Sequence, residues 1–332
     1  MVVTSHDVAR LAGVSQPTVS RALRNSPKVS EQTKRRVRQA ATTLGYVPSE
    51  TGRALSSGRT RRIGLLLTDL ENQFYPHVIA PMHRELEALD YQLMLQTESS
   101  DTGRVVERLL ANSLDGVLLA TTTVDSVLPV RLRDRGVPFA YFNRTSYSVD
   151  ADSAEVDAEV GLQQLAQRIL ELGHRRVGAI FGPRNTSTAE HREYALREAL
   201  GAASVTIGSA LSCRGPFDVE TGHVGGRRLL ERDDPPTVIV CGNDVVAFGA
   251  LNAAHELGLA VPGDVSIAGF DDLPAARWPV LQLTTVAFDL DAMARCAAGL
   301  LVARIEEGPD APYRHERFPS RLVERRTLGV AR

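Results

Sequence analysis

Hydrophobic positions in the first 45 residues predict three short helices, because each segment repeats apolar residues at i, i+3 and i+4. This spacing puts the apolar side chains of each helix on one face, so the three faces can pack together. The residues concerned are Val8, Leu11 and Ala12 in the first segment, Val19, Ala22 and Leu23 in the second, and Val37, Ala40, Ala41 and Leu44 in the third. We therefore expect an all-α head.

Polar residues and glycines mark the ends of these helices. Thr4 and Asp7 have capping-box spacing at the start of the first helix, and Gly13 supplies the left-handed turn that ends it. Ser15 and Ser30 are placed to cap the second and third helices. Two short helices joined by a tight Gly-Val-Ser turn and braced by a third form a helix-turn-helix unit.

The second helix would present polar residues away from its apolar face, where they can enter a DNA major groove. Arg21 can pair bidentately with guanine and Gln16 can read a base edge. Hydroxyl and amide side chains near basic residues can bind phosphates and fix the register. The predicted DNA contacts of the head are Thr4, Ser5, Ser15, Gln16, Pro17, Thr18, Arg21, Asn25, Ser30 and Thr33. A generic three-helix protein-interaction domain is the alternative.

Beyond residue 62 the pattern changes to short apolar runs that alternate with helical stretches. The runs are IGLLL, YQLML, GVLLA, FAYF, VGAIF, VIVCG and VSIAGF. Strands alternating with helices predict parallel sheets in an α/β fold. There are two such series, 62–157 and 158–286, which indicates two similar lobes with a ligand cleft at the carboxyl ends of the strands.

Charge separates the two parts. Residues 1–62 carry 12 Lys and Arg against three acidic residues, whereas the remaining 270 carry 26 against 37. A basic head on an acidic body favours binding of DNA by the head, although a solvated basic face would look the same. The apolar runs are far shorter than a membrane span, and no apolar signal region precedes the first helix, so we expect a cytoplasmic protein with no membrane partner.

The candidate chemistry contains no metal site and no cofactor motif. Cys213, Cys241 and Cys296 are widely spaced without a CxxC pair, which favours structural thiols over a disulfide or a zinc site. The sequence has no P-loop, no GxGxxG after a strand, no GxSxG and no HExxH. We therefore expect that the protein is not an enzyme; a sugar- or nucleoside-processing enzyme is the weak alternative, with Asp271 and Asp272 as its acid/base pair.

The head resembles that of the LacI/GalR (lactose-repressor) family in the runs TSHDVARLAGVSQPTVSRAL, KVSEQTKRRV and LGYVP. The resemblance extends to about Leu328 and implies a two-lobed, periplasmic-binding-protein-like α/β body of two parallel doubly wound sheets. The implied boundaries are 1–47 for the helix-turn-helix domain, 48–61 for a hinge, 62–157 and 287–316 for lobe one, and 158–286 and 317–329 for lobe two.

The hinge of the family places a leucine in the minor groove of the operator, where it unstacks a base step. The matching run here is PSETGRAL, so the resemblance implies Leu55 as the wedge and Arg53 as a backbone contact. Ser49 and Gly52 depart from the family pattern, and glycine costs a helix interior about 1 kcal/mol relative to alanine.

The resemblance also implies effector contacts at the ends of strands. They are Phe74, Tyr75, Arg144, Thr188, Arg192, Phe217, Asn243 and Asp271. An aromatic face with arginine and aspartate suits a sugar-like ring and its hydroxyls. Phe74 and Phe217 could instead be core residues. We expect Asp244 to cap the helix that follows it, and Asp272 to be structural rather than a ligand contact.

The predicted function is a sequence-specific repressor, a homodimer on palindromic DNA, controlled by a small sugar-like effector. A dimer rather than a tetramer is expected because no C-terminal heptad helix follows residue 328. Control by a protein partner, or by a nucleoside or purine, stays open. We do not expect a transport-type binding protein, because no signal-peptide pattern precedes the first helix.

Overall fold

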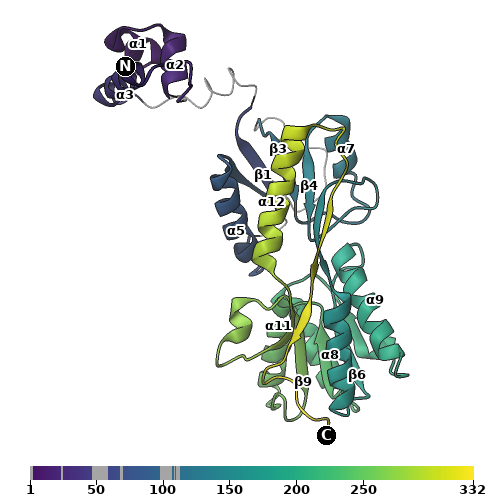
Figure 1. Cartoon of the computed structure of the whole chain (residues 1–332). Helices are drawn as coiled ribbons and strands as arrows, with labels where there is room; N and C mark the ends of the chain where they lie inside the picture. The colour runs from purple at the N-terminus through teal and green to yellow at the C-terminus, as the bar shows by residue number, and fades with distance from the viewer. Residues whose placement is uncertain are drawn as a thin grey trace. The chain divides into compact units, whose positions relative to one another are not determined.

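The structure is a computed structural model of the chain and describes residues 3–23, 25–46, 59–67, 70–97, 107, 109 and 113–332. It divides into two compact units, Met1–Thr60 and Arg61–Arg332, called the head and the body below (Figure 1). Over these described ranges no helix is both long and apolar enough to cross a lipid bilayer.

Three helices form the head: α1 (Ser5–Ala12), α2 (Gln16–Leu23) and α3 (Glu31–Leu44). The backbone N and the hydroxyl of Thr4 both donate to the carboxylate of Asp7, over 3.0 and 2.7 Å. Gly13 has φ +64°, and the hydroxyl of Ser30 accepts from the backbone N of Thr33. The predicted capping box, the Gly13 turn and the Ser30 cap are therefore confirmed, because local hydrogen bonding and glycine turns fix them. The hydroxyl of Ser15 lies 2.8 Å from that of Thr18, and its predicted role as a cap stays a prediction.

The head core differs from the predicted apolar stripe at one position. Leu11 is 54% exposed, while Ala9 is buried beside Val8 and Ala12. The prediction for Leu11 was wrong because α1 contacts both α2 and α3, so its buried face is rotated by about one residue from the stripe that spacing alone selects.

Lobe one of the body is a sheet in the order β11-β5-β4-β3-β1-β2 with every neighbouring pair parallel. Its strands are β1 (Arg62–Leu67), β2 (Gln92–Thr97), β3 (Gly116–Leu119), β4 (Phe139–Phe142), β5 (Ser153–Asp157) and β11 (His315–Pro319). Its helices include α5 (Tyr75–Ala88), α7 (Leu128–Asp134) and α12 (Leu290–Glu307). Figure 1 shows α5 and α12 side by side on this lobe.

Lobe two repeats this arrangement in the order β12-β10-β9-β8-β6-β7, with β12 antiparallel to β10. Its strands are β6 (Val177–Phe181), β7 (Ser212–Arg214), β8 (Val238–Cys241), β9 (Ser266–Phe270), β10 (Thr284–Ala287) and β12 (Arg321–Val323). Its helices are α8 (Glu159–Glu171), α9 (Ser187–Gly201), α10 (Val219–Leu230), α11 (Asp244–Glu256) and the short η1 (Ser209–Leu211) and η2 (Pro274–Arg277).

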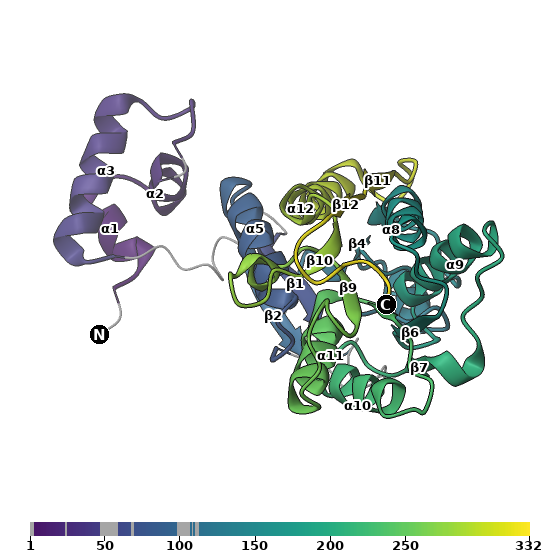
Figure 2. The same cartoon turned by 90° about the horizontal axis from the view of Figure 1, so that it is seen from below.

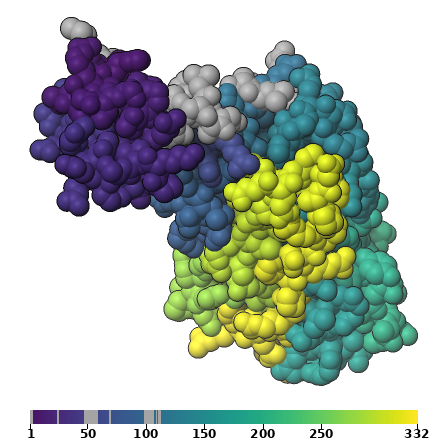
Figure 3. Space-filling view, turned by 45° about the horizontal axis from the view of Figure 1, so that its top comes forward, coloured from purple at the N-terminus to yellow at the C-terminus, as the bar shows by residue number. Residues whose placement is uncertain are grey.

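All seven predicted apolar runs form strands, and the strands that no run predicted are short or polar. β5 and β11 read SAEVD and HERFP, and their charged side chains are partly or fully exposed. They carry the chain between the lobes, which it crosses after β5, after β10 and after β11. The C-terminal part, yellow in Figure 3, lies on the surface of the body.

Helices α10 and α11 lie side by side at very close range (Figure 2). Their contact is made by Gly222 on α10 and Gly249 on α11. A Cβ on Gly249 would collide with the carbonyl oxygen of Val219 and lie 2.6 Å from the backbone N of His223. Only glycine therefore allows the two backbones to approach this closely, which fixes α11 behind the cleft.

Candidate functional site

A narrow cavity lies between the two lobes of the body. Its volume is about 20 Å³, which is room for about one water molecule. Lobe one contributes Asn72, Phe74, Tyr75, Ala120, Asn143 and Arg144, and lobe two contributes Thr188, Arg192, Phe217, Asn243 and Asp271. Every residue predicted as an effector contact therefore lines this one cavity.

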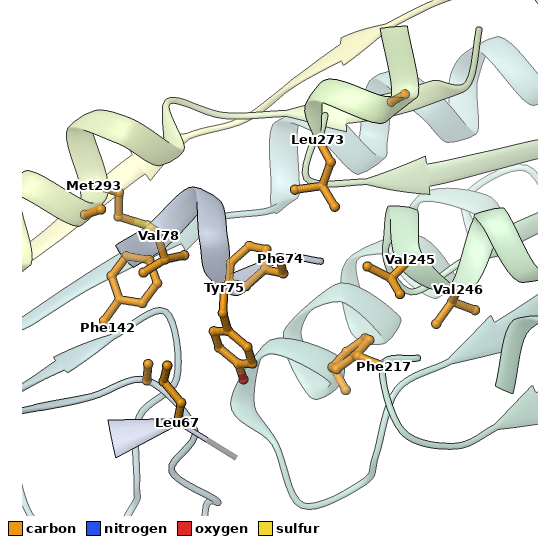
Figure 4. Packing of buried hydrophobic residues seen from close by; sticks show 14 of the residues in the cluster. Leu67, Phe74, Tyr75, Val78, Phe142, Phe217, Val245, Val246, Leu273 and Met293 are labelled. Atoms are coloured by element: carbon orange, nitrogen blue, oxygen red, sulfur yellow. The ribbon is translucent and has the colours of Figure 1, made fainter. Parts of the chain in front are cut away.

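Each lining segment follows the carboxyl end of a strand, as the α/β pattern predicts. Figure 4 shows Phe74 and Tyr75 at the start of α5, with Phe217 facing them from the other lobe. Asn72 joins the two sides: its Oδ1 accepts from the backbone N of Phe74 over 2.9 Å, and its Nδ2 donates to the carbonyl of Phe217 over 2.7 Å. Phe74 and Phe217 belong to the core and line the cavity at once.

A buried ion pair crosses the floor of the cavity. Nη2 of Arg192 donates to Oδ1 of Asp271 over 2.9 Å, and Nη1 donates to the carbonyl of Gly242 over 2.9 Å. The guanidinium also lies 3.8 Å from the ring centroid of Phe270. Burial raises the pKa of Asp271 to about 6 although Arg192 opposes the shift, and burial lowers the pKa of Arg192. The anionic partner that Arg192 requires is thus supplied by the protein.

Three buried polar atoms at the cavity have no hydrogen-bond partner among the described residues. They are Nε of Arg192, Oγ1 of Thr188 and Oδ1 of Asn143. An unsatisfied buried donor or acceptor costs about 1–3 kcal/mol. Such groups gathered at one cavity can be satisfied by a polar ligand.

The aromatic wall depends on glycines that the sequence analysis missed. The ring of Phe217 packs on the backbone at Gly182 and Gly242, and a Cβ on Gly182 would collide with the ring. Asn72, Ala120 and Asn143 were also absent from the predicted contacts. The position of each beside a strand end was the signal that could have identified them.

The helix start at α11 corrects one prediction. Asn243, not Asp244, caps the helix: its Oδ1 accepts from the backbone N of Val246 over 2.9 Å. Asp244 is fully buried, accepts from the backbone N of Leu273 and the hydroxyl of Thr285, and has a raised pKa because of burial. The local pattern could not reveal these two partners because they lie 29 and 41 residues away.

The loop after β9 is held in an unusual backbone conformation. Asp271 has φ +113° and Asp272 has φ +51°, both in the region that disfavours side chains. Asp272 accepts from Arg277 over 2.9 Å and from Arg325 over 2.6 Å. This confirms the structural role expected of Asp272, and it leaves Asp271 facing the cavity.

Further hydrogen bonds join the lobes beside the cavity. The backbone N of Thr145 donates to the hydroxyl of Ser187 over 3.0 Å, and the hydroxyl of Tyr147 donates to Glu190 over 2.5 Å. The backbone N of Val124 donates to a lobe-two carbonyl over 2.9 Å. With the bond from Asn72, these contacts hold the lobes closed on their own side chains.

A larger hollow of about 1140 Å³ lies between α8 and α9. Glu159, Glu171, Tyr194 and Glu198 on its rim are exposed. Within the described ranges, none of the buried side-chain atoms that lack a hydrogen-bond partner belongs to a residue that lines it. Size alone therefore does not make this hollow the stronger ligand site.

The head presents the predicted reading residues near the start of α2. Pro17 and Arg21 are exposed, and Gln16 donates from Nε2 to the hydroxyl of Ser5 over 3.3 Å. The hydroxyls of Ser15 and Thr18 lie 2.8 Å apart. These contacts orient polar side chains at the N-terminal end of the helix, where groove-reading residues are found.

Other predicted DNA contacts lie around α3. Asn25 has φ +56° and accepts from Arg38 over 3.3 Å, and the hydroxyls of Ser30 and Thr33 lie 2.9 Å apart. Arg53 and Leu55, the predicted hinge contacts, lie outside the described residues.

A helix-turn-helix head on a body of two parallel α/β lobes defines a class: DNA-binding regulators with a binding-protein-like body. Comparison with known proteins supports both parts. Residues 4–49 match the family described as bacterial regulatory proteins, lacI family, and residues 166–328 match a periplasmic binding protein-like domain. The chain is 32% identical over 99% of its length, and 97% of the relative's, to the HTH-type transcriptional repressor PurR of Pectobacterium carotovorum subsp. carotovorum (strain PC1). The chain belongs to the LacI family.

Two solved structures resemble the chain over nearly its whole length. The transcriptional regulator CelR in complex with cellobiose is 31% identical, with a TM-score of 0.74 over 98% of this chain and 100% of that one. The lac repressor dimer bound to operator and the anti-inducer ONPF is 24% identical, with a TM-score of 0.87 over 98% of this chain and 99% of that one. At this identity, the comparison with the lac repressor dimer shows a common fold and nothing more.

Proposed function

We propose that the protein is a transcriptional repressor whose affinity for a palindromic operator is controlled by a small sugar or sugar derivative bound in the inter-lobe cavity. The observation that carries the proposal is the convergence of unpartnered buried atoms of Asn143, Thr188 and Arg192 on that cavity. The ring of Phe217 would cover the apolar face of the ligand, while Arg192 and Asp271 would bind its hydroxyls. The structure of CelR with cellobiose supports a sugar.

A nucleobase is the second candidate. Phe217 can stack on a flat ring, and the carboxylate of Asp271 and the hydroxyl of Thr188 can accept from or donate to ring nitrogens. Control by a protein partner remains the third, and it would leave the cavity without a role.

Control would follow from the geometry of the closed lobes. A cavity of about 20 Å³ holds about one water molecule, so an effector must move the lobes or displace the side chains that fill the space. Binding then stabilises one arrangement of the body over another, and DNA affinity changes by that difference. In the proposed organisation, residues 48–61 form the hinge that transmits the change, with Arg53 and Leu55 on the operator.

The repressor would act as a homodimer in the cytoplasm, since a twofold-symmetric operator requires two heads. The lac repressor neighbour is a dimer on its operator. Trp278 and Val280 are 57% and 85% exposed in the loop before β10. Exposed apolar side chains of this kind suit a surface that a second copy covers.

The test is a thermal-stability screen of the full chain against sugars, sugar phosphates, sugar acids and nucleosides, followed by operator binding with each hit. A ligand that binds the folded state raises the melting temperature. The site variant is Thr188→Val and the control is Thr122→Val, because both hydroxyls are buried without a described partner and only Thr188 lines the cavity.

We expect Thr188→Val to weaken binding about tenfold, the value of one lost hydrogen bond, and Thr122→Val to leave it unchanged. A hit should also change operator affinity. Equal binding by both variants would place the ligand elsewhere, and a wild type that no ligand stabilises would favour control by a protein partner.

A further inference from the structure

The charged residues that line the cavity do not balance. They are Arg144, Arg192 and Asp271. Arg192 and Asp271 pair over 2.9 Å, so their charges compensate each other. Asp244 does not line the cavity, and its carboxylate accepts from the backbone N of Leu273 and the hydroxyl of Thr285. One positive charge, that of Arg144, is left over.

Arg144 has no carboxylate partner among the described residues. In this respect Arg144 differs from the other arginines in this part of the body that are buried or half-buried. Within 113–332, every other buried or half-buried arginine pairs with an Asp or Glu of the described chain: Arg168, Arg176, Arg192, Arg197, Arg214, Arg227, Arg295, Arg304, Arg314 and Arg325. Arg144 is half-buried at the cavity and forms no ion pair with the described chain, so its guanidinium is available to an anionic ligand, whereas those of the arginines just named are already paired.

The backbone fixes Arg144 toward the cavity. Asn143 before it has φ +63°, and the backbone N of Arg144 donates to the carbonyl of Phe142 over 2.7 Å. Thr145 after it is anchored to the other lobe through Ser187. The guanidinium of Arg144 lies 5.6 Å from the ring centroid of Phe217, on the ring that Arg192 approaches to 6.0 Å.

The unpartnered groups at the cavity also favour an acceptor-rich ligand. Nε of Arg192 can only donate, the hydroxyl of Thr188 can donate, and Arg144 adds up to five N–H donors. Oδ1 of Asn143 is an acceptor, and these donors outnumber it. A neutral sugar offers hydroxyls that both donate and accept, but a phosphate or carboxylate matches the planar guanidinium bidentately.

We propose that the effector carries an oxyanion, a phosphate or a carboxylate, that binds Arg144, so that Arg144 determines specificity for anionic over neutral ligands. The inference rests on the proposed function, because it concerns the same cavity. An anionic effector would distinguish this protein from the similar regulator CelR, whose bound ligand is the neutral disaccharide cellobiose.

The test measures binding of inorganic phosphate and of acetate to the full chain at constant ionic strength, by titration calorimetry, with Arg144→Gln and Arg144→Lys. The control is Arg184→Gln, which removes an exposed arginine outside the cavity. The basic head binds phosphate equally in all variants. The difference in phosphate binding between the wild type and Arg144→Gln therefore measures the contribution of the cavity alone. Phosphate and acetate distinguish the two sources of the oxyanion.

We expect saturable binding of at least one anion, weakened at least tenfold in Arg144→Gln, partly retained in Arg144→Lys and unchanged in Arg184→Gln. Among matched ligands, glucose 6-phosphate or glucuronate should bind at least tenfold more tightly than glucose, and Arg144→Gln should abolish that preference. Equal anion binding by the wild type and Arg144→Gln would overturn the proposal.

The two proposals fail differently. A neutral sugar whose binding depends on Thr188 but not on Arg144 would overturn the anionic effector and leave the proposed function standing. Anion binding that depends on Arg144 but leaves operator affinity unchanged at saturation would keep the anion site and refute effector control.

Discussion

Replacing Arg192 by methionine removes the cation of the buried pair and keeps a long side chain in its place. With Arg192 present, the pKa of Asp271 is already raised from 3.8 to about 6 by burial. Without Arg192, the strongest opposition to burial, at 2.9 Å, is lost and only that of Arg144 remains. Because a nearby opposite charge lowers the pKa of a carboxyl by about 1–3 units, we expect this pKa to rise above about 7.5. The perturbation therefore makes the free energy of unfolding depend on pH.

The magnitude follows from linkage. A carboxyl whose folded pKa is raised destabilises the protein as pH rises from its unfolded to its folded pKa, because the unfolded chain releases the proton first. At about 1.4 kcal/mol per pKa unit, the interval from about 6 to pH 7.5 adds about 2 kcal/mol to the cost in Arg192→Met. Losing the hydrogen bond to Gly242 adds about 1 kcal/mol. The total is about 3 kcal/mol at pH 7.5, but only about 1 kcal/mol at pH 5.5, where Asp271 is mostly protonated in both proteins.

The assay is urea unfolding followed by circular dichroism at the two pH values. The control, Arg84→Met, breaks a pair with Asp291 that has the same 2.9 Å distance but is more than half exposed on the arginine side. It should cost at most about 1 kcal/mol. Arg192→Met combined with Asp271→Asn should remove the pH dependence, because asparagine carries no charge and tolerates the positive φ of this position.

The reasoning would be refuted by a loss for Arg192→Met that is the same at pH 5.5 and 7.5. A loss no larger than that of Arg84→Met at pH 7.5 would contradict it too, because burial would then not distinguish the two pairs.

Three further predictions concern function. Gly182→Ala should displace the ring of Phe217 and weaken effector binding about tenfold, equivalent to about 1.4 kcal/mol, with little change in operator binding by the unliganded protein; calorimetry and a gel-shift assay measure the two. Tyr147→Phe removes the hydrogen bond to Glu190 and should favour open lobes by about 1 kcal/mol, seen as faster hydrogen exchange along the cleft; unchanged exchange would contradict this. Arg21→Ala should weaken operator binding by about 1–3 kcal/mol and reduce sequence preference; an equal loss on random DNA would show that Arg21 contacts only phosphate.

The head could be predicted almost completely from its sequence. Its helix ends depend on contacts within a few residues, such as Thr4 with Asp7 and Ser30 with Thr33. Six of the seven apolar runs gave central strands, since a strand buried on both faces must be apolar along its length. The seventh, YQLML, forms the edge strand β2, where Met94 and Leu95 are exposed. Leu11 was misplaced because its exposure depends on how two other helices lie against α1.

Eight of the eleven residues that line the cavity were predicted through family resemblance, and the position of the cavity beside strand ends was predicted through the α/β pattern. The role of each residue in the cavity was not predicted. Asn243 rather than Asp244 caps α11, and Gly182 carries the ring of Phe217. The cap itself is local, but the choice between the two residues depends on the partners of Asp244, which lie 29 and 41 residues away. The ring on Gly182 likewise comes from a loop 35 residues further along the chain.

The sequence by itself therefore determined the two-part organisation, the helix-turn-helix head and the segments that border the cleft, since periodicity, capping and charge act over short distances along the chain. Only the tertiary structure decided which charges compensate each other. It paired Arg192 with Asp271, 79 residues away, and left Arg144 without a described carboxylate. The sign of the charge in a buried site depends on distances and desolvation between residues far apart in the chain, and no pattern of neighbouring residues encodes those.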